Sequence, residues 1–182
     1  MNEIASKGQL RLSYLRWALF TVPTVVFLGF LSGRLSNSGY QNRWFVALDK
    51  PEIMPPAIAF PIVWGLCYLL MGLAIAVILH ARGARMRTPA ILLFIVALLL
   101  NLGWSPIFFG QHKVLLAFYL IVAMIVVTLV TIILFLQVRK SAALLMIPYI
   151  AWLGFAATLN YQVHQLNPDA EKLVVPALRT HI

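Results

Sequence analysis

The sequence contains few charged side chains. Only 10% of its 182 residues are Asp, Glu, Lys or Arg, whereas a soluble domain carries about 25%. Hydrophobic residues make up 62% of the chain, and the mean hydropathy is +0.91. This composition excludes an ordinary soluble enzyme, a nucleic-acid-binding domain and a disordered protein, and it predicts a small integral membrane protein in a lipid bilayer.

Acidic residues are absent from all the long apolar stretches. A carboxylate at the centre of a membrane helix costs roughly 2.5–3.5 kcal/mol on insertion scales and therefore marks function where it occurs. The sequence has five acids, and all of them lie in the tails or in one long connection. This absence argues against a proton-coupled pump of the usual kind and against hydrolysis by paired carboxylates.

Cysteine and histidine are also too sparse to form a familiar catalytic or metal site. Cys67 is the single cysteine of the chain, which excludes an internal disulfide and an iron–sulfur cluster. The four histidines are scattered along the sequence without metal-ligand spacing. We therefore predict no catalytic residues, no metal and no required cofactor.

What the sequence does contain is five windows without Asp, Glu, Lys or Arg, at 17–33, 53–80, 88–112, 114–138 and 141–168. A membrane-spanning helix needs about 20 apolar residues, and the unbroken apolar runs do not alternate as barrel strands would. We predict an all-α integral membrane protein whose five transmembrane helices, at about 14–34, 57–80, 89–109, 114–137 and 141–164, form a bundle.

The predicted bundle forms one membrane domain, residues 1–166, followed by a polar tail, 167–182, which we expect to fray. Basic residues are slightly more numerous on the side that holds the N-terminus, so the positive-inside rule places the N-terminus in the cytoplasm and the C-terminus outside. The basic residues on the N-terminal side are Lys7, Arg11, Arg16, Arg82, Arg85, Arg87, Arg139 and Lys140.

One connection, about 35–56, is much longer than the others. Its apolar residues, among them Trp44, are unusual for a solvated linker, and Pro51, Pro55 and Pro56 restrict the backbone. Loops of this length are often lids or binding loops. We interpret the segment as a stiff lid; the alternative is a passive spacer.

Small and bend-forming residues occur inside the predicted spans. Pro61, Pro106 and Pro148 lie in three different helices and predict bends. Gly29 and Gly33 form a G-x-x-x-G pair, which favours close helix contact and weakly indicates a homodimer.

Three tryptophans, Trp64, Trp104 and Trp152, lie inside three different spans rather than at the membrane interfaces. Indole rings from separate helices can converge on a flat apolar ligand. Asn101 and Asn160 could orient such a ligand. Simple core packing of the rings, and hydrogen bonding between helices by the amides, are the alternatives.

Three segments together resemble the translocator protein family, also called the tryptophan-rich sensory proteins or TspO/MBR family. They are W-F-V-A-L-D-K-P-E-I-M-P-P-A-I-A-F-P-I-V-W-G-L-C-Y-L-L-M-G (44–72), N-L-G-W-S-P-I-F-F (101–109) and P-Y-I-A-W-L-G-F-A-A-T-L-N-Y (148–161). The matches lie in the family's order across most of the chain. Within them, Ile53 replaces a tryptophan that is usual between the lid prolines.

The resemblance implies a five-helix bundle, commonly dimeric, with a pocket that is capped by the first long loop. It implies that Trp64 and Trp152 flank a porphyrin, haem or related ligand, that Asn101, Trp104 and Ala156 shape the pocket, and that Trp44, Pro51, Pro55 and Pro56 build the lid. The residues that follow Tyr161 depart from the sterol-recognition pattern of animal relatives.

The resemblance favours a membrane receptor or carrier for tetrapyrroles, which regulates or transports them. Two alternatives remain open at this point. One is light-dependent porphyrin breakdown, in which Trp64 and Trp152 would be oxidised by the excited ligand. The other is a structural or assembly factor for other membrane proteins.

Overall fold

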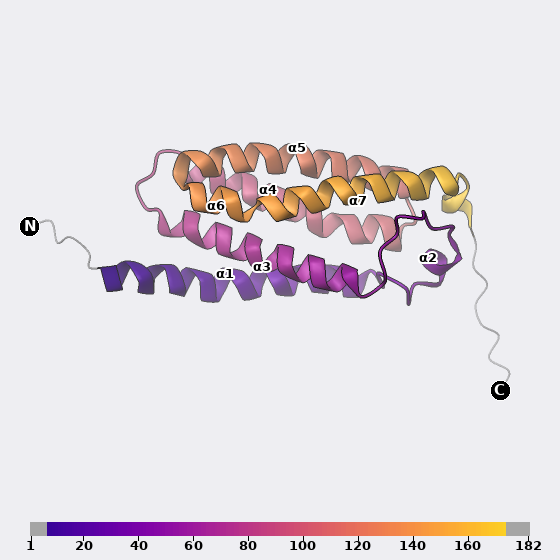
Figure 1. The fold of residues 1–182 in the computed structure, drawn as a ribbon, viewed down its shortest axis with the longest axis horizontal. Coiled ribbons are helices and arrows are strands. Elements are labelled where there is room, and N and C mark those ends of the chain that lie inside the picture. Colours follow the sequence, from indigo (N-terminus) through magenta and orange to yellow (C-terminus); the bar gives the residue numbers. More distant parts are fainter. Residues whose placement is uncertain (1–6, 174–182) are drawn as a thin grey trace, which may run out of the picture.

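The computed structural model describes residues 7–173, in which all regular secondary structure is helical. Long helices alternate with short ones, and two segments depart from α-helical geometry (Figure 1). The elements are α1 (Lys7–Leu35), α2 (Arg43–Ala47), α3 (Ala59–His80), α4 (Arg87–Ser105), the π-helix η1 (Pro106–Gly110), α5 (Val114–Val138), α6 (Lys140–Leu145), α7 (Ile147–Leu166) and the 3₁₀-helix η2 (Ala170–Lys172).

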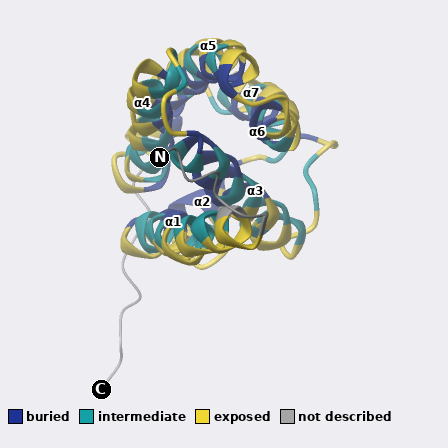
Figure 2. Ribbon diagram, turned by 90° about the vertical axis from the view of Figure 1, so that its left-hand side faces the viewer, coloured by how far each residue is buried: buried dark blue, intermediate teal, exposed yellow. Residues whose placement is uncertain are grey.

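The long helices lie side by side and form a ring when the bundle is viewed from its end (Figure 2). Helix α1 packs mainly on α3, α3 on α6, the α6–α7 pair on α5, and α5 on α4. Contacts between α1 and α4 close the ring. The exposed side chains face outward and are largely apolar, which suits a surface that meets lipid.

All five predicted spans are present, with shifted ends. Helices long and apolar enough to cross a membrane cover 11–35, 59–80, 87–110, 114–138 and 140–166. The largest difference is at α1, which begins at Lys7 rather than near residue 14. The apolar window predicts only the part of a helix that lies in the membrane, and the polar residues before it extend the same helix beyond the bilayer. The last span is interrupted at Met146, between α6 and α7.

The three prolines that predicted bends have different roles. Pro106 begins the π-helix η1, and Pro148 follows directly on the interruption at Met146, so both coincide with departures from regular helix. The prediction for Pro61 was wrong, because Pro61 lies in the first turn of α3, where its missing N–H leaves no hydrogen bond unmade.

The closest helix contact joins α1 and α3. A Cβ atom added to Gly72 would lie 2.6 Å from the Val22 Cα atom, so the two backbones touch at this point. The Thr21 hydroxyl donates to the Gly72 carbonyl at 2.7 Å. This hydrogen bond fixes how far the helices slide against each other.

The interpretation of Gly29 and Gly33 as a dimer motif is wrong, because the space above both glycines is filled from within the chain. A Cβ atom at Gly29 would lie 2.2 Å from Cε2 of the Tyr68 ring, and one at Gly33 would lie 2.9 Å from the Ser38 hydroxyl oxygen. The homodimer stays a prediction without this motif.

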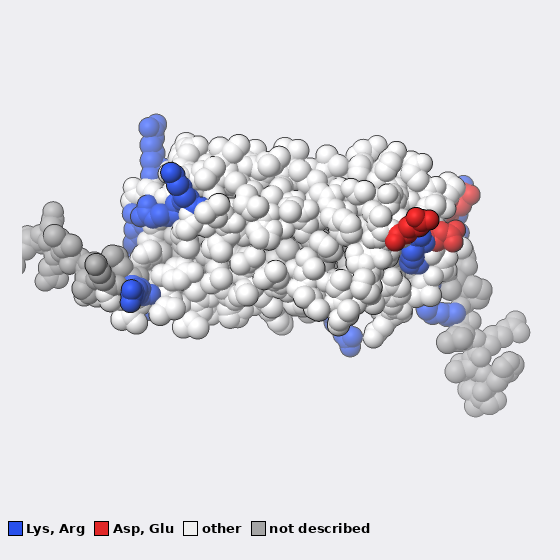
Figure 3. Space-filling view, viewed as in Figure 1, with Lys and Arg blue, Asp and Glu red and all other residues white. Residues whose placement is uncertain are grey.

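The two ends of the bundle differ in charge (Figure 3). In the described part of the chain, the end that holds the first turns of α1 carries basic residues and no acid. The opposite end carries basic residues together with all the described acids, Asp49, Glu52, Asp169 and Glu171. We call these the basic end and the lid end.

We predict that Gly72→Ala destabilises the folded protein by about 1–3 kcal/mol, because its methyl group meets the Val22 backbone, which cannot move aside cheaply. Thermal unfolding in detergent measures the change. Gly154→Ala is the matched control, since nothing lies within 4 Å of the added Cβ atom. Equal unfolding temperatures for the two variants would contradict the close contact.

Candidate functional site

A cavity of about 470 Å³ lies inside the lid-end half of the bundle. Its walls come from α1, α3, α4, η1, α5 and α7, and residues of the long loop close its end. The volume is within the range of about 300–1,000 Å³ that is typical of small-molecule sites. The lining is mainly apolar and aromatic.

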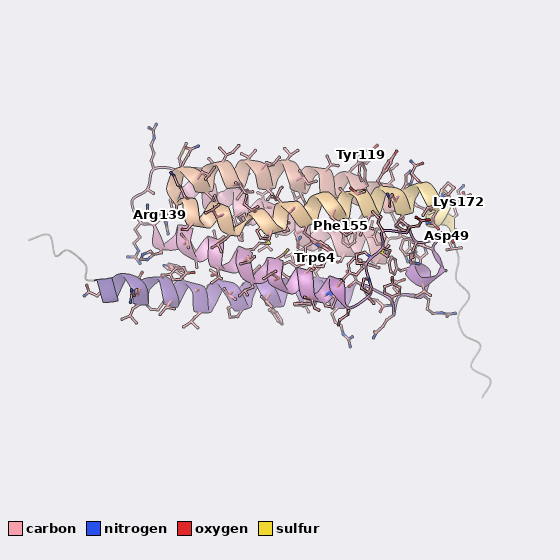
Figure 4. All side chains as sticks on the ribbon, in the orientation of Figure 1. Asp49, Trp64, Tyr119, Arg139, Phe155 and Lys172 are labelled. Atoms are coloured by element: carbon pink, nitrogen blue, oxygen red, sulfur yellow. The ribbon has the colours of Figure 1, made fainter. Side chains whose placement is uncertain are left out.

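Two tryptophans from different helices form one wall of this cavity. The ring centroids of Trp64, in α3, and Trp152, in α7, lie 6.3 Å apart, and the rings are nearly perpendicular. Trp64 also stacks on Tyr68 at 5.4 Å, and Phe60 packs edge-on against Trp152 at 6.1 Å. Figure 4 shows Trp64 pointing into the space between the helices.

Asn101 joins three helices at the floor of the cavity. It is 5% exposed and lies in α4, where its side-chain oxygen accepts a hydrogen bond from the Tyr68 hydroxyl at 3.1 Å. Its amide nitrogen donates to the Tyr149 hydroxyl of α7 at 3.1 Å. The amide therefore satisfies two buried phenols, and its role is to hold the floor in place.

Trp104 and Ala156 line the cavity as well, one from α4 and the other from α7. The Trp104 indole N–H donates to the Asn160 side-chain oxygen at 3.2 Å, and its ring stacks on Phe108 at 5.0 Å. Asn160 in turn donates to the Val114 carbonyl at 2.8 Å. Ala156 lies one turn beyond Trp152, where its small side chain leaves the cavity open.

One buried donor at the cavity has no partner in the described residues. The Trp152 indole nitrogen is inaccessible to solvent and forms no hydrogen bond. An unmade hydrogen bond of this kind costs free energy. At the mouth, Arg34, Asn37 and Ser38 supply polar groups and one positive charge.

Trp44, which the resemblance assigns to the lid, lies in the long loop but turns its side chain away from the cavity. Trp44 is 3% exposed but does not line the cavity, because the short helix α2 turns its side chain toward η1 and the C-terminal segment. Its ring stacks on His112 at 4.2 Å, and its indole N–H donates to the Ala170 carbonyl at 2.9 Å.

The prolines of the long loop likewise shape the lid without touching the cavity. Pro51, Pro55 and Pro56 are absent from the cavity lining. Phe45 and Met54 line it instead, with Tyr40 and Gln41. The residues of the lid that face the cavity are therefore 37–41, Phe45, Met54 and Ala57.

The expectation that the C-terminal segment frays directly after Asn167 is wrong for residues 167–173, which hold the lid down. The Asn167 side chain accepts a hydrogen bond from the Asp49 amide at 2.8 Å and donates to the Asp49 carbonyl at 2.9 Å. Ala170 is buried beside Trp44. The rest of the predicted tail, 174–182, lies outside the described residues.

Two ionisable groups of the lid have altered pKa values. Burial lowers the pKa of the Lys50 ammonium, and the charge of Asp49 partly opposes this shift. The ammonium donates to the Leu48 carbonyl at 2.6 Å and lies 4.6 Å above the Phe45 ring, so it closes the end of α2. Burial also lowers the pKa of His112, which favours the neutral ring that stacks on Trp44.

Sequence reasoning missed several residues of the site. Tyr68 lies one turn after Trp64, and this spacing could have indicated a second aromatic ring on the same face. Tyr149 and Phe108 could not be found in this way, because helix rotation decides which side chains face inward. In residues 7–173, no three potential metal-binding side chains of His, Cys, Asp or Glu come together.

Comparison with known sequences agrees with the family resemblance of the three segments. Residues 12–166 match the sequence model of the TspO/MBR family. The chain is 37% identical to the tryptophan-rich protein TspO of Chlorobaculum tepidum over 126 residues, which cover 69% of this chain and 80% of that protein. It is 37% identical to the translocator protein of Sus scrofa over 141 residues, 76% and 83% of the two chains. The protein CrtK of Rhodobacter capsulatus is 30% identical over 138 residues, 74% and 84%.

We predict that Trp44→Phe loosens the lid, because phenylalanine keeps the stacking on His112 but cannot donate to Ala170. The loss of one hydrogen bond, about 0.5–1.5 kcal/mol, raises the fraction of open lid by up to about tenfold. Hydrogen exchange of the 43–48 amides measures this opening. Trp17→Phe, at the basic end, is the control, and unchanged exchange in Trp44→Phe would show that the tail does not hold the lid.

Proposed function

The chain belongs to the TspO/MBR family of multi-pass membrane proteins, and on this premise we propose that it is a receptor or carrier that binds tetrapyrroles in the lid-end cavity. The observation that carries the proposal is the meeting of Trp64 and Trp152 across one apolar space. Porphyrin and haem are flat and largely apolar, and perpendicular indoles offer one ring to stack and one edge to contact such a molecule.

The polar groups around the cavity fit the periphery of the same ligand class. Porphyrins of biological origin carry carboxylate side chains on one edge of an apolar ring system. The Arg34 guanidinium lies at the mouth, where a carboxylate keeps its access to water.

The proposed role also needs a way in and a way out. The lid is held by a small satellite cluster, in which Trp44, Phe45 and Leu48 pack near Phe108 and Phe109, and by a few polar contacts of Trp44 and Asn167. Segments of this kind open at lower free energy than the packed bundle. We propose that the ligand passes at the lid end.

We place the basic end, with the N-terminus, in the cytoplasm and the lid outside. The support is the charge distribution of the bundle, because basic residues in short connections remain on the cytoplasmic side. In the described part of the chain, the basic end includes Arg82, Arg85 and Arg87 in one turn and has no acid to balance them.

Titration of the purified protein with protoporphyrin IX tests the binding proposal. We expect saturable binding, and we expect Trp64→Ala or Trp152→Ala to weaken it by roughly tenfold, equivalent to about 1.4 kcal/mol. The absorbance of the porphyrin is the readout, because it does not depend on the tryptophan that was removed. Trp17→Phe, outside the cavity, should bind as the wild type does. Superposable curves for wild type and Trp64→Ala would overturn the proposal.

A second titration tests the role of Arg34. We expect Arg34→Gln to weaken binding of protoporphyrin IX by about fivefold, since an accessible charged hydrogen bond is worth about 1 kcal/mol. Binding of the dimethyl ester of the same porphyrin should not change, because the ester has no carboxylate for the guanidinium. Equal weakening for acid and ester would show that Arg34 acts on the lid and not on the ligand.

A further inference from the structure

A second hollow lies at the basic end of the molecule, opposite the lid-end cavity. It has a volume of about 270 Å³ and is lined by Ser13, Arg16, Trp17 and Phe20 of α1 and by Arg82 from the turn after α3. Two guanidinium groups from separate segments thus face one space, above an aromatic floor.

The side chains of these two arginines have no protein partner in the described residues, whereas the side chains of Arg87 and Arg139 do. Arg87 donates to the Ile78 and Leu79 carbonyls at 3.2 and 3.0 Å and so caps α3, and Arg139 donates to the Val138 carbonyl. Within residues 7–173, the guanidinium groups of Arg16 and Arg82 form no hydrogen bond or ion pair with protein. Their positive charges are therefore available to an external anion.

No described carboxylate competes for this anion. The acids of residues 7–173 all lie at the lid end, and the one ion pair in this range, Lys172 with Asp169, is there as well (Figure 3). The Ser13 hydroxyl is close to the hollow and is hydrogen-bonded to the His80 ring at 3.1 Å. The hollow has a uniformly positive rim.

The position of the hollow relative to the membrane narrows the class of anion. Arg16 is the last charged residue before the apolar window 17–33, which places Arg16 and Trp17 at the boundary between lipid headgroups and hydrocarbon. Phe20 is one turn deeper and is 66% exposed. A molecule that fills the hollow meets guanidinium groups at one end and an apolar, lipid-facing surface at the other.

We propose that this hollow binds the headgroup of an anionic phospholipid, with its phosphate between Arg16 and Arg82 and the start of its acyl chains on Trp17 and Phe20. Basic pockets on the cytoplasmic side of membrane proteins bind such headgroups. A free phosphate would leave the aromatic floor uncovered, which is why the structure favours a lipid. The inference does not depend on what the lid-end cavity binds.

Native mass spectrometry of the full chain in detergent tests the site with phosphatidylglycerol and phosphatidylcholine of identical acyl chains. We expect the wild type to retain phosphatidylglycerol in preference to phosphatidylcholine. Each guanidinium near the membrane surface contributes about 1 kcal/mol to the free energy of binding an anionic lipid. The double variant Arg16→Gln/Arg82→Gln should therefore lose about 30-fold in affinity for phosphatidylglycerol.

Arg85→Gln/Lys140→Gln is the matched control, because it removes two charges from the same end and neither residue lines the hollow. It should retain phosphatidylglycerol as the wild type does. An equal loss in both double variants would overturn the site in favour of diffuse attraction, and so would a wild type that does not distinguish the two lipids.

Competition with a soluble phosphate distinguishes a bound lipid from a bound free anion. Millimolar glycerol phosphate should not displace the bound lipid, and displacement would show that the hollow binds a soluble phosphate instead. Arg16→Lys/Arg82→Lys should keep much of the affinity for phosphatidylglycerol. All variants should unfold in detergent at the wild-type temperature, which verifies that they are folded without relying on any ligand.

Discussion

The hydrogen bonds of Asn101 are the interaction on which the interior of this bundle depends. From α4, one amide connects the Tyr68 hydroxyl of α3 and the Tyr149 hydroxyl of α7. In lipid, none of these groups could find water instead, so the three helices are held at one rotation and one depth. The same rotation brings Trp64 and Trp152 into the cavity. The wall of the cavity thus follows from a polar contact below it.

The spans could be predicted from the sequence because the bilayer imposes a length on every apolar helix and excludes charge from its centre. The inward orientation of Trp64 and Trp152 was a different kind of prediction. Apolar residues surround both tryptophans, so no periodicity marks which face is buried, and the family resemblance supplied what the pattern could not. The lid was predicted as a segment, but its contacts were not. Trp44 binds Ala170, more than a hundred residues away in sequence, and no local rule gives such a pairing.

The departures from regular helix explain how a small bundle can enclose an open space. The π-helix at Pro106 turns Phe108 and Phe109 toward the lid, where they pack with Phe45. The interruption at Met146 lets α6 pack on α3 while α7 packs on α5. Apolar helices in lipid approach as closely as their side chains allow, so these irregular segments help to keep a space open beside the edge-on pair of Trp64 and Trp152.

The two ends of the molecule differ in how their charged side chains are paired. At the lid end, carboxylates, Lys172 and Lys50 are near one another, so fixed charges are balanced within the chain and the loop can close over an apolar space. At the basic end, the guanidinium groups of Arg87 and Arg139 donate to backbone carbonyls, whereas those of Arg16 and Arg82 do not. Unbalanced guanidinium groups at headgroup depth attract anionic lipid, whose charge would offset their mutual repulsion. A lipid bound there would rest against α1 and the turn that follows α3, and the Thr21–Gly72 contact joins α1 to α3. The basic end would in this way anchor the helix pair that carries Trp64 and Arg34 at the other end.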